Sequence, residues 1–381
     1  MEKFKLISTL FISILLIFSG CNVETDTTQP GQIINTESQT VTFSNNTNAN
    51  FTMIDISFID GRTSDSIILG EDLLEVPYTT NVKPFRLAMY ETSYNTWYEV
   101  LKWAKNNGYT IVNKGVEGVF GEVEKENNMS GPGEEPKLVE MPVCRLTWRD
   151  VMALSEMKGL EPVYFTDKDF KTPLRDSTGV ALNDLENYAI EPGEVDNPYV
   201  NTNANGFRLP YVKEWEYAAR KRLDGTAISG RNVSGDETGS AIKTTATEKM
   251  NGISFTLSSK QNEYCWQRQN SASNGPSKTY TGQDDTNTTL SAKTGKSISG
   301  RRMHLSGGKL PNHLGFFDMS GNVPEWCFDY DVTYGSVYKF STARGLRGGD
   351  YLNEIVGSRC SGYKGGALVG LAFGFRIAQN H

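Results

Sequence analysis

The stretch from Gly315 to Arg376 constrains the fold of this chain most. It contains GFFDMSGNVPEW, then RGLRGGDYLN, and it closes on FGFRIA. Glycine pairs flank aromatic residues and arginine, and no helical 3.6-residue period of apolar side chains runs through the stretch. The pattern predicts short strands joined by tight turns and irregular loops, which together form a rigid scaffold for a surface near the end of the sequence.

Charge and length limit the remaining possibilities. The chain has 381 residues and a formal net charge of −7. It therefore lacks the global basic surface that neutralises phosphates, and we expect no nucleic-acid partner. Length alone suggests about two or three domains, although a single loop-rich domain with long insertions fits as well.

The first residues indicate a processing signal. Lys3 and Lys5 precede an apolar run from Leu6 to Phe18, which is too short to span a membrane comfortably. The run ends in Phe-Ser-Gly-Cys21, which resembles a bacterial lipobox and implies cleavage before Cys21 and lipidation of its thiol. We therefore predict a lipoprotein signal peptide at 1–20 and a lipid anchor on the bacterial cell surface, in the outer membrane. The alternative is a plain secretory signal whose cysteine is incidental.

Residues 21–50 are rich in Thr, Asn and Gln and contain few apolar side chains. Such a segment buries too little surface to offset its ordering entropy, so we predict a flexible tether. The folded body should begin near Phe51.

Periodicity predicts the first elements of that body. Alternating apolar residues indicate strands at Phe51–Ile56 and Phe85–Glu91. A helix should follow, because Thr92 or Ser93 can cap it and apolar residues then repeat on one face until Asn107-Gly108.

A second helix is predicted from Thr147 to Met157, with Gly159 as its end. An extended segment should follow at 162–165. Two polar stretches rich in Gly, Pro and Asp, at 115–137 and 166–203, are expected to be long insertions with a functional or accessory role.

The sharpest internal motif is GFRLP followed by KEWEYAAR, within residues 206–220. Phe207 and Leu209 share one face of an extended segment, as alternate residues of a strand do. Trp215, Ala218 and Ala219 share one face of a helix whose first turn is acidic. The motif predicts a strand, a turn and a short buried helix.

Taken in order, the motifs of this chain resemble one family. GFRLPYVKEWEYAAR, YCWQRQNS, LGFFDMSGNVPEW, RGLRGGDY and GFRIA, with MYETSYNTW and PVCRLTWRDVMAL upstream, are similar to the formylglycine-generating-enzyme or sulfatase-modifying-factor type of C-type lectin fold. The resemblance covers about residues 80–378. It implies a loop-rich α+β fold with little regular secondary structure, formed as a single domain over 51–381.

The enzymes of that family resemble one another in a pair of cysteines in the last loop before the GFR strand, which bind copper and oxidise a substrate cysteine. Aligned on the terminal GFR, Cys360 falls close to the second cysteine and Ile355 stands where the first would be. One thiolate alone makes a poor copper(I) site, and His304, His313 and His381 show no ligand spacing. We therefore predict no catalytic residue and no enzyme activity. The alternative is a formylglycine-generating-type copper oxidase, or another modifying enzyme, with an altered active site.

The other cysteines give no sign of a disulfide or a metal site. Cys144, Cys265, Cys327 and Cys360 are widely separated and form no CxxC pair. Three of them have apolar or aromatic neighbours, so isolated buried thiols are predicted.

Four acidic residues near the C-terminus leave two interpretations. Asp318, Glu325, Asp329 and Asp331 could line an acidic pocket or a calcium site. We favour turn residues and strand caps, because Asp is common in turns on its own account. No cofactor is therefore predicted, although a structural calcium ion stays open because homologues of this fold sometimes bind one.

The last segment carries a closer resemblance. It runs from RGGDY through a mixed stretch to FGFRIA, as in the variable proteins of diversity-generating retroelements, whose hypervariable residues lie between an RGG-type motif and a terminal GFR. The resemblance implies a variable region at about 344–378 on a surface-anchored ligand-binding lipoprotein. The predicted ligand-binding residues are Asp350, Tyr351, Leu352, Tyr363, Lys364, Leu368, Val369 and Leu371.

Five residues should form a fixed framework around that face: Trp326, Arg347, Arg359, Phe375 and Arg376. The tyrosine and aliphatic side chains of the face favour a protein or another macromolecule as ligand.

Overall fold

The structure of this protein is a computed structural model. It describes residues 32–381 with the exception of 44–45, 71–76, 119–128, 139, 180–189, 237–240, 244–248, 251–252, 255, 259, 269, 272–301, 331–343, 353–354, 363 and 367–372. The predicted signal peptide and Cys21 lie outside the described residues. No helix in the described part is long and apolar enough to cross a membrane.

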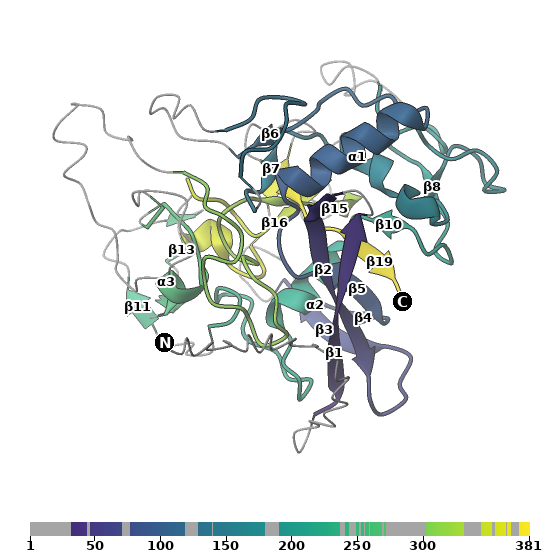
Figure 1. Cartoon of the computed structure of the whole chain (residues 1–381). Coiled ribbons are helices and arrows are strands. Elements are labelled where there is room, and N and C mark those ends of the chain that lie inside the picture. Colours follow the sequence, from purple (N-terminus) through teal and green to yellow (C-terminus); the bar gives the residue numbers. More distant parts are fainter. Residues whose placement is uncertain are drawn as a thin grey trace, which may run out of the picture.

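A five-stranded sheet joins the two ends of the described chain (Figure 1). Its order is β1 (Ile34–Phe43), β2 (Asn46–Phe58), β5 (Phe85–Ala88), β19 (Ala378–Asn380) and β10 (Phe207–Arg208), and every neighbouring pair is antiparallel. Strand β19 thus lies between β5 and β10, so the last residues of the sequence complete the sheet.

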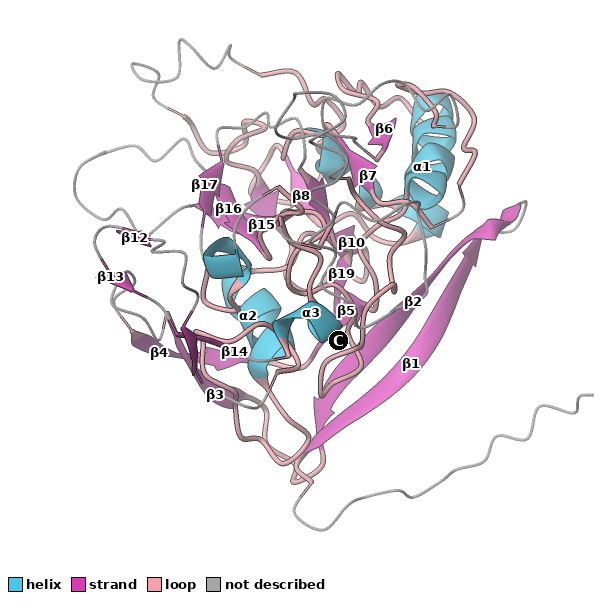
Figure 2. Cartoon of the chain, turned by 90° about the vertical axis from the view of Figure 1, so that its left-hand side faces the viewer, coloured by secondary structure: helices cyan, strands magenta, loops and turns pink. Residues whose placement is uncertain are grey.

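The prediction of a flexible tether over 21–50 is wrong from residue 34 onward. Residues 34–43 form β1, which pairs with β2 from Ile34 opposite Phe58 to Phe43 opposite Asn46, with an irregularity after Val41. The partner strand satisfies the backbone of this polar, Thr-rich segment, and Ile34 is fully buried. The folded body therefore begins before Phe51. Figure 2 shows the long β1–β2 hairpin along one side of the molecule.

The predicted first helix is confirmed as α1 (Tyr94–Asn106), and Ser93 is its cap because its hydroxyl accepts a hydrogen bond from the Thr96 amide. The predicted second helix is wrong. Its residues form two short 3₁₀ turns, Asp150–Leu154 and Met157–Gly159. The Asp150 carboxylate accepts hydrogen bonds from the Thr147 amide and hydroxyl, which offers this backbone an alternative to α-helical bonding.

The GFRLP and KEWEYAAR motif folds as predicted into β10 and α2 (Val212–Arg220). Glu214 accepts a hydrogen bond from the Tyr211 amide at 2.9 Å, and the carboxylate of Asp329 accepts one from the Val212 amide. Both carboxylates lie at the helix N-terminus, where they satisfy amides that have no partner inside the helix.

A second sheet brings together the motifs near the C-terminus. Its order is β17 (Lys364–Gly366), β16 (Arg344–Arg347), β15 (Glu325–Tyr330) and β18 (Gly374–Phe375). Strands β15 and β18 are parallel, with Glu325 opposite Gly374 and Trp326 opposite Phe375. The PEW, RGLRGG and GFR motifs therefore lie side by side, as the sequence pattern of short strands and turns predicted.

The remaining elements are short. They are β3 (Asp65–Leu69) with β4 (Tyr78–Val82), β6 (Val116–Glu117) with β7 (Val143–Cys144), β8 (Tyr164–Phe165) with β9 (Tyr199–Val200), β11 (Ala241–Lys243) with β14 (Thr256–Ser258), β12 (Lys249–Met250) with β13 (Ile253–Ser254), α3 (Gln261–Tyr264) and a 3₁₀ turn at Ile355–Ser358. The described chain is thus α+β, with much of its length in loops, as expected.

One buried ion pair connects the two sheets. Arg376 and Glu325 are both fully buried, and the closest N–O distance between their side chains is 2.8 Å. The same guanidinium donates hydrogen bonds to the carbonyl oxygens of Ala88, Met89 and Phe317. The Glu325 carboxylate also accepts one from the Trp215 indole at 2.7 Å. Arg376 therefore fixes β15, the end of β5 and the loop before Asp318 relative to one another.

Substitution of Arg376 tests this role. The variant Arg376→Met leaves the Glu325 carboxylate buried without its cation, so we expect a loss of about 3–5 kcal/mol in the free energy of unfolding, measured by urea denaturation. Arg175→Met is the matched control, because it removes a half-exposed pair with Glu156 and should cost less than about 1 kcal/mol. Equal losses in the two variants would contradict the assignment.

Candidate binding site at the C-terminal segment

The candidate site is the C-terminal segment, residues 350–373, and its start is fixed by the glycine pair after β16. Gly348 and Gly349 both have positive φ, at 89° and 71°. A Cβ atom on Gly349 would lie 2.6 Å from the Gly357 carbonyl oxygen and 2.6 Å from the Ser358 hydroxyl. Only glycine fits this close approach, so the RGG turn holds the beginning of the segment against the 3₁₀ turn at Ile355–Ser358.

Asn322 fixes the next residues of the segment. It has a φ of 56°, and its carbonyl oxygen accepts a hydrogen bond from the Tyr351 amide at 3.2 Å. Its side-chain amide donates to Glu91 at 2.7 Å, while its side-chain oxygen accepts from the His304 amide at 2.9 Å. Asn322 thus connects the segment to a buried carboxylate and to the His304 loop.

Arg347 holds the part of the segment around Ser361, where the chain runs back toward the core. Its guanidinium donates to the Ser361 carbonyl oxygen at 3.0 Å and lies 3.3 Å from a carboxylate oxygen of Glu216. The neighbouring Cys360 is fully buried, with its sulfur 3.6 Å from the Ala219 carbonyl oxygen. Burial raises the pKa of the Cys360 thiol, so this sulfur is a neutral packed thiol at ordinary pH.

The predicted framework is confirmed. Trp326, Arg347, Arg359, Phe375 and Arg376 are all buried. The Trp326 indole donates to the Leu146 carbonyl oxygen at 3.0 Å, and the Phe375 ring packs edge-on against Trp97. Burial also lowers the pKa of Arg359 to about 10. These buried residues contact other parts of the described chain and so hold the backbone around the segment in place.

The expectation of exposure is wrong for two of the predicted ligand-binding residues. Tyr351 is 1% exposed and packs in a core cluster with Val116, Met141, Cys144, Met303 and Val323. Asp350 is 5% exposed, and its carboxylate accepts a hydrogen bond from the Leu352 amide at 2.8 Å. Both residues lie under the turn instead of on its surface, because the glycine pair and Asn322 draw this backbone inward.

The other predicted residues are placed only in part. Leu352 is 39% exposed and stays a predicted binding residue. The backbone of Lys364 lies in β17, opposite Leu346 of β16. Tyr363, Leu368, Val369 and Leu371 lie outside the described residues.

Three of the four acidic residues have structural roles, although only Asp318 has the left-handed backbone typical of a turn, as the favoured interpretation expected. Glu325 is paired with Arg376, and Asp329 caps α2. Asp318 has a φ of 53° and accepts a hydrogen bond from the Gly307 amide at 2.6 Å. Asp331 lies outside the described residues. Across the part of the chain that the structure describes, no group of three or more His, Cys, Asp or Glu side chains could hold a metal ion.

Sequence reasoning did not single out Glu91, which is 3% exposed. It accepts hydrogen bonds from the Val323 amide, the Asn322 side chain and the Ser306 hydroxyl. Burial and the nearby charges of Asp318 and Glu325 raise its pKa well above the ordinary value. The available signal was a carboxylate that follows soon after the end of strand β5 at Ala88, in the MYETS motif.

The four cysteines from Cys144 onward are free and buried, as predicted. Cys144 lies with its sulfur 3.1 Å from the sulfur of Met303, inside the cluster that contains Tyr351.

Comparison with known families identifies the scaffold. A family model described as "Sulfatase-modifying factor enzyme 1-like domain" matches residues 61–381. A curated relative, chaperone protein LppX of Paenibacillus barcinonensis, is 28% identical over 218 residues, which is 55% of this chain. The matched region spans 60% of the length of that relative.

Two solved structures share the fold. Treponema denticola variable protein 1 aligns with a TM-score of 0.55 and 20% identity, over 90% of this chain and 99% of its own. CarF aligns with a TM-score of 0.50 and 18% identity, over 84% of this chain and 97% of its own. The predicted α+β fold of the formylglycine-generating subtype is thereby confirmed, and so is the resemblance to the variable proteins at the level of the scaffold.

The Asp318 carboxyl gives this region a testable pH dependence. Burial raises its pKa from the usual 3.8 to about 6. A carboxyl whose folded-state pKa is raised stabilises the fold below its unfolded pKa, and that contribution is lost as the pH rises from about 4 to about 6. Asp318→Asn, which keeps the side-chain shape, should therefore gain about 2–3 kcal/mol relative to the unsubstituted protein between pH 4 and pH 8, measured by urea unfolding. A stability difference that does not change with pH would contradict the raised pKa.

Proposed function

We propose that this chain, which belongs to the sulfatase-modifying factor enzyme 1-like domain family, binds a ligand through the C-terminal segment and catalyses no reaction. The observation that carries the proposal is the burial of the framework residues before, within and after the segment. The described framework contacts come from arginine, tryptophan and glycine residues, together with the buried Arg359 and the partly buried Phe373 at the inner side of the segment. Such a scaffold tolerates many side chains at the exposed positions, as a diversified binding face requires.

The state of Cys360 supports a binding role over oxidation. A copper(I) site requires accessible thiolates, preferably paired. The Cys360 sulfur is buried, its pKa is raised, and the 3₁₀ turn that begins at Ile355 offers no second thiol. Fold alone does not decide function, so the argument rests on this site.

We further propose that the protein is displayed on the bacterial surface through a lipid on Cys21. The sequence from Lys3 to Cys21 supports the anchor. Because β1 begins at Ile34, the tether between the lipid and the folded body is the short segment 22–33. The ligand is a protein or another macromolecule, since an exposed Leu352 and the tyrosyl and aliphatic residues of the segment suit a large apolar contact. Sibling genes of the same genome should differ mainly between residues 352 and 373, because Asp350 and Tyr351 are buried.

Tolerance to substitution tests the binding face. A combined variant with Leu352→Asp, Lys364→Glu, Leu368→Asp and Leu371→Asp should lose less than about 1 kcal/mol of unfolding free energy, because the proposal places these side chains on the replaceable face and outside the core. The control Arg347→Ala removes one of the two guanidinium partners of the buried Glu216 and the donor to the Ser361 carbonyl oxygen, and it should cost about 2–3 kcal/mol. Urea denaturation measures both. A combined variant that is as unstable as the control would show that the segment is core and not a replaceable face.

Copper titration tests the enzyme alternative. The protein should take up no stoichiometric copper(I) in competition with a colorimetric chelator, because the one thiol near the expected position is buried and neutral. Cys360→Ser should behave in the same way as the unsubstituted protein. One equivalent of copper(I), lost in Cys360→Ser, would favour the oxidase.

A further inference from the structure

A cavity of about 310 Å³ lies between β2 and the start of α1. Its volume is within the range of small-molecule sites in proteins. None of its described lining residues belongs to the C-terminal segment, so it is separate from the proposed binding face. The lining residues are Asn50, Phe51, Thr52, Ala88, Tyr90, Glu91, Thr92, Ser93, Thr96, Glu140, Ser306 and Ile377.

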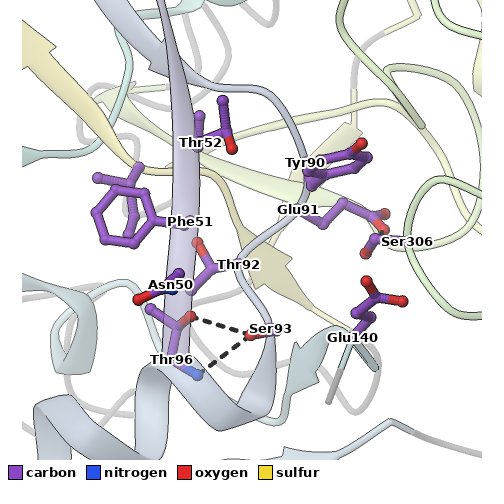
Figure 3. Close-up of a pocket in the computed structure, with 12 residues that line it drawn as sticks. Asn50, Phe51, Thr52, Tyr90, Glu91, Thr92, Ser93, Thr96, Glu140 and Ser306 are labelled. Carbon is purple, nitrogen blue, oxygen red and sulfur yellow. Dashed lines mark hydrogen bonds between the residues drawn. The ribbon is translucent and has the colours of Figure 1, made fainter. Parts of the chain in front are cut away.

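The polar groups of this cavity are arranged on two sides. Figure 3 shows Glu91, Ser306 and Glu140 along one side and Asn50, Phe51 and Thr92 along the other. The side chains of Ser93 and Thr96 are joined to each other by a 3.1 Å hydrogen bond, so they are engaged in capping α1.

Two polar atoms at the cavity have no hydrogen-bond partner. Thr92 is 4% exposed, and its hydroxyl oxygen is buried and unpartnered. The side-chain oxygen of Asn50 is also buried and unpartnered. A buried polar atom without a partner costs free energy, and both of these oxygens can accept a hydrogen bond. A ligand with N–H groups would supply the donors that these two oxygens have no partner for.

Carboxyl groups gather on the same side of the molecule. Glu91 and Glu140 line the cavity, and the buried Asp318 lies nearby. Neither Glu91 nor Asp318 forms an ion pair with any described residue. No Lys, Arg or His is among the described residues that line the cavity. A cation bound here meets carboxyl groups and no lining residue of like charge, and its presence favours the ionised form of Glu91.

Apolar surface lies beside these charges. Tyr90 stacks on Phe317 with ring centroids 4.8 Å apart, which holds the Tyr90 ring in place. Phe51 packs edge-on against Phe207, and Ala88 and Ile377 complete the apolar lining. Aromatic faces attract cations and also cover an apolar ligand body.

We propose that this cavity binds a small organic ammonium ion with N–H donors on an apolar body. The ammonium group is held between Glu91 and Glu140 and donates to the oxygen atoms of Thr92 and Asn50. The apolar body lies against Phe51 and Tyr90. The proposal does not depend on the function of the C-terminal segment.

Binding of 2-phenylethylammonium to the full folded protein tests the proposal. We expect a dissociation constant on the order of 1 mM by titration calorimetry or ligand-observed NMR. The uncharged 2-phenylethanol, which has nearly the same shape, should bind at least about tenfold more weakly because it lacks the charge. Calcium chloride at the same concentration should not displace the ammonium ion. Equal binding of the alcohol, displacement by calcium, or no binding of the ammonium at about 10 mM would each overturn the proposal.

Variants locate the site. Glu140→Gln should weaken ammonium binding about tenfold, because a charge-assisted hydrogen bond is lost, and Thr92→Val should weaken it about threefold. Glu161→Gln is the matched control, since Glu161 is an exposed glutamate outside the lining set, and it should leave the affinity unchanged. Near-ultraviolet circular dichroism checks that each variant is folded. Unchanged affinity in folded Glu140→Gln, or an equal loss in Glu161→Gln, would show that the cation binds elsewhere.

Discussion

The ion pair between Arg376 and Glu325 is the interaction on which the rest of this structure depends. A chain with so much of its length in loops leaves many backbone carbonyl oxygens without partners in helices or sheets. Arg376 satisfies three of them while its charge is neutralised by Glu325. Indole groups act in the same way, since Trp97, Trp148 and Trp326 donate to the carbonyl oxygens of Lys114, Cys327 and Leu146. Long buried donors thus replace much of the regular hydrogen bonding that this fold lacks.

This arrangement separates the residues that hold the backbone in place from the residues that we propose contact a ligand. The backbone on either side of the C-terminal segment is fixed by Arg347, Asn322 and the glycine pair, all of which contact other parts of the chain. The same contacts bury Asp350 and Tyr351, so the first two residues after the RGG turn are part of the core and not of the exposed surface. The binding face that we propose therefore begins no earlier than Leu352. The cavity near α1 is lined by other elements, so the ligand proposed for it does not depend on the side chains of the segment.

Sequence reasoning recovered the parts of the fold whose signals are local. Helix α1 has a capping serine and one apolar face, and the GFRLP motif leads into α2 through a capping glutamate. Strand β1 was missed because its stability comes from pairing with β2, which composition does not reveal. The 3₁₀ turns at 150–159 have helical periodicity, but Asp150 redirects the backbone through bonds to Thr147 and Asn113. The burial of Tyr351 depends on contacts between residues far apart in sequence, so no local pattern could predict it. The contacts of Glu91 are also long-range, and the MYETS motif marks only the position of its carboxylate.

The position of β19 and β18 has a consequence for how the molecule is made. Residues 374–380 supply a strand to both sheets, between β5 and β10 in one and beside β15 in the other. During translation residues 374–380 leave the ribosome after their partner strands β5, β10 and β15. These strands and the carboxylate of Glu325 can therefore form their native contacts only after residues 374–380 have been synthesised. The contacts of residues 374–380 are therefore among the last to become possible, and they join residues of long sequence separation. A chain interrupted before residue 374 would expose an open sheet edge and an unpaired buried acid, which are features that proteases and chaperones act upon.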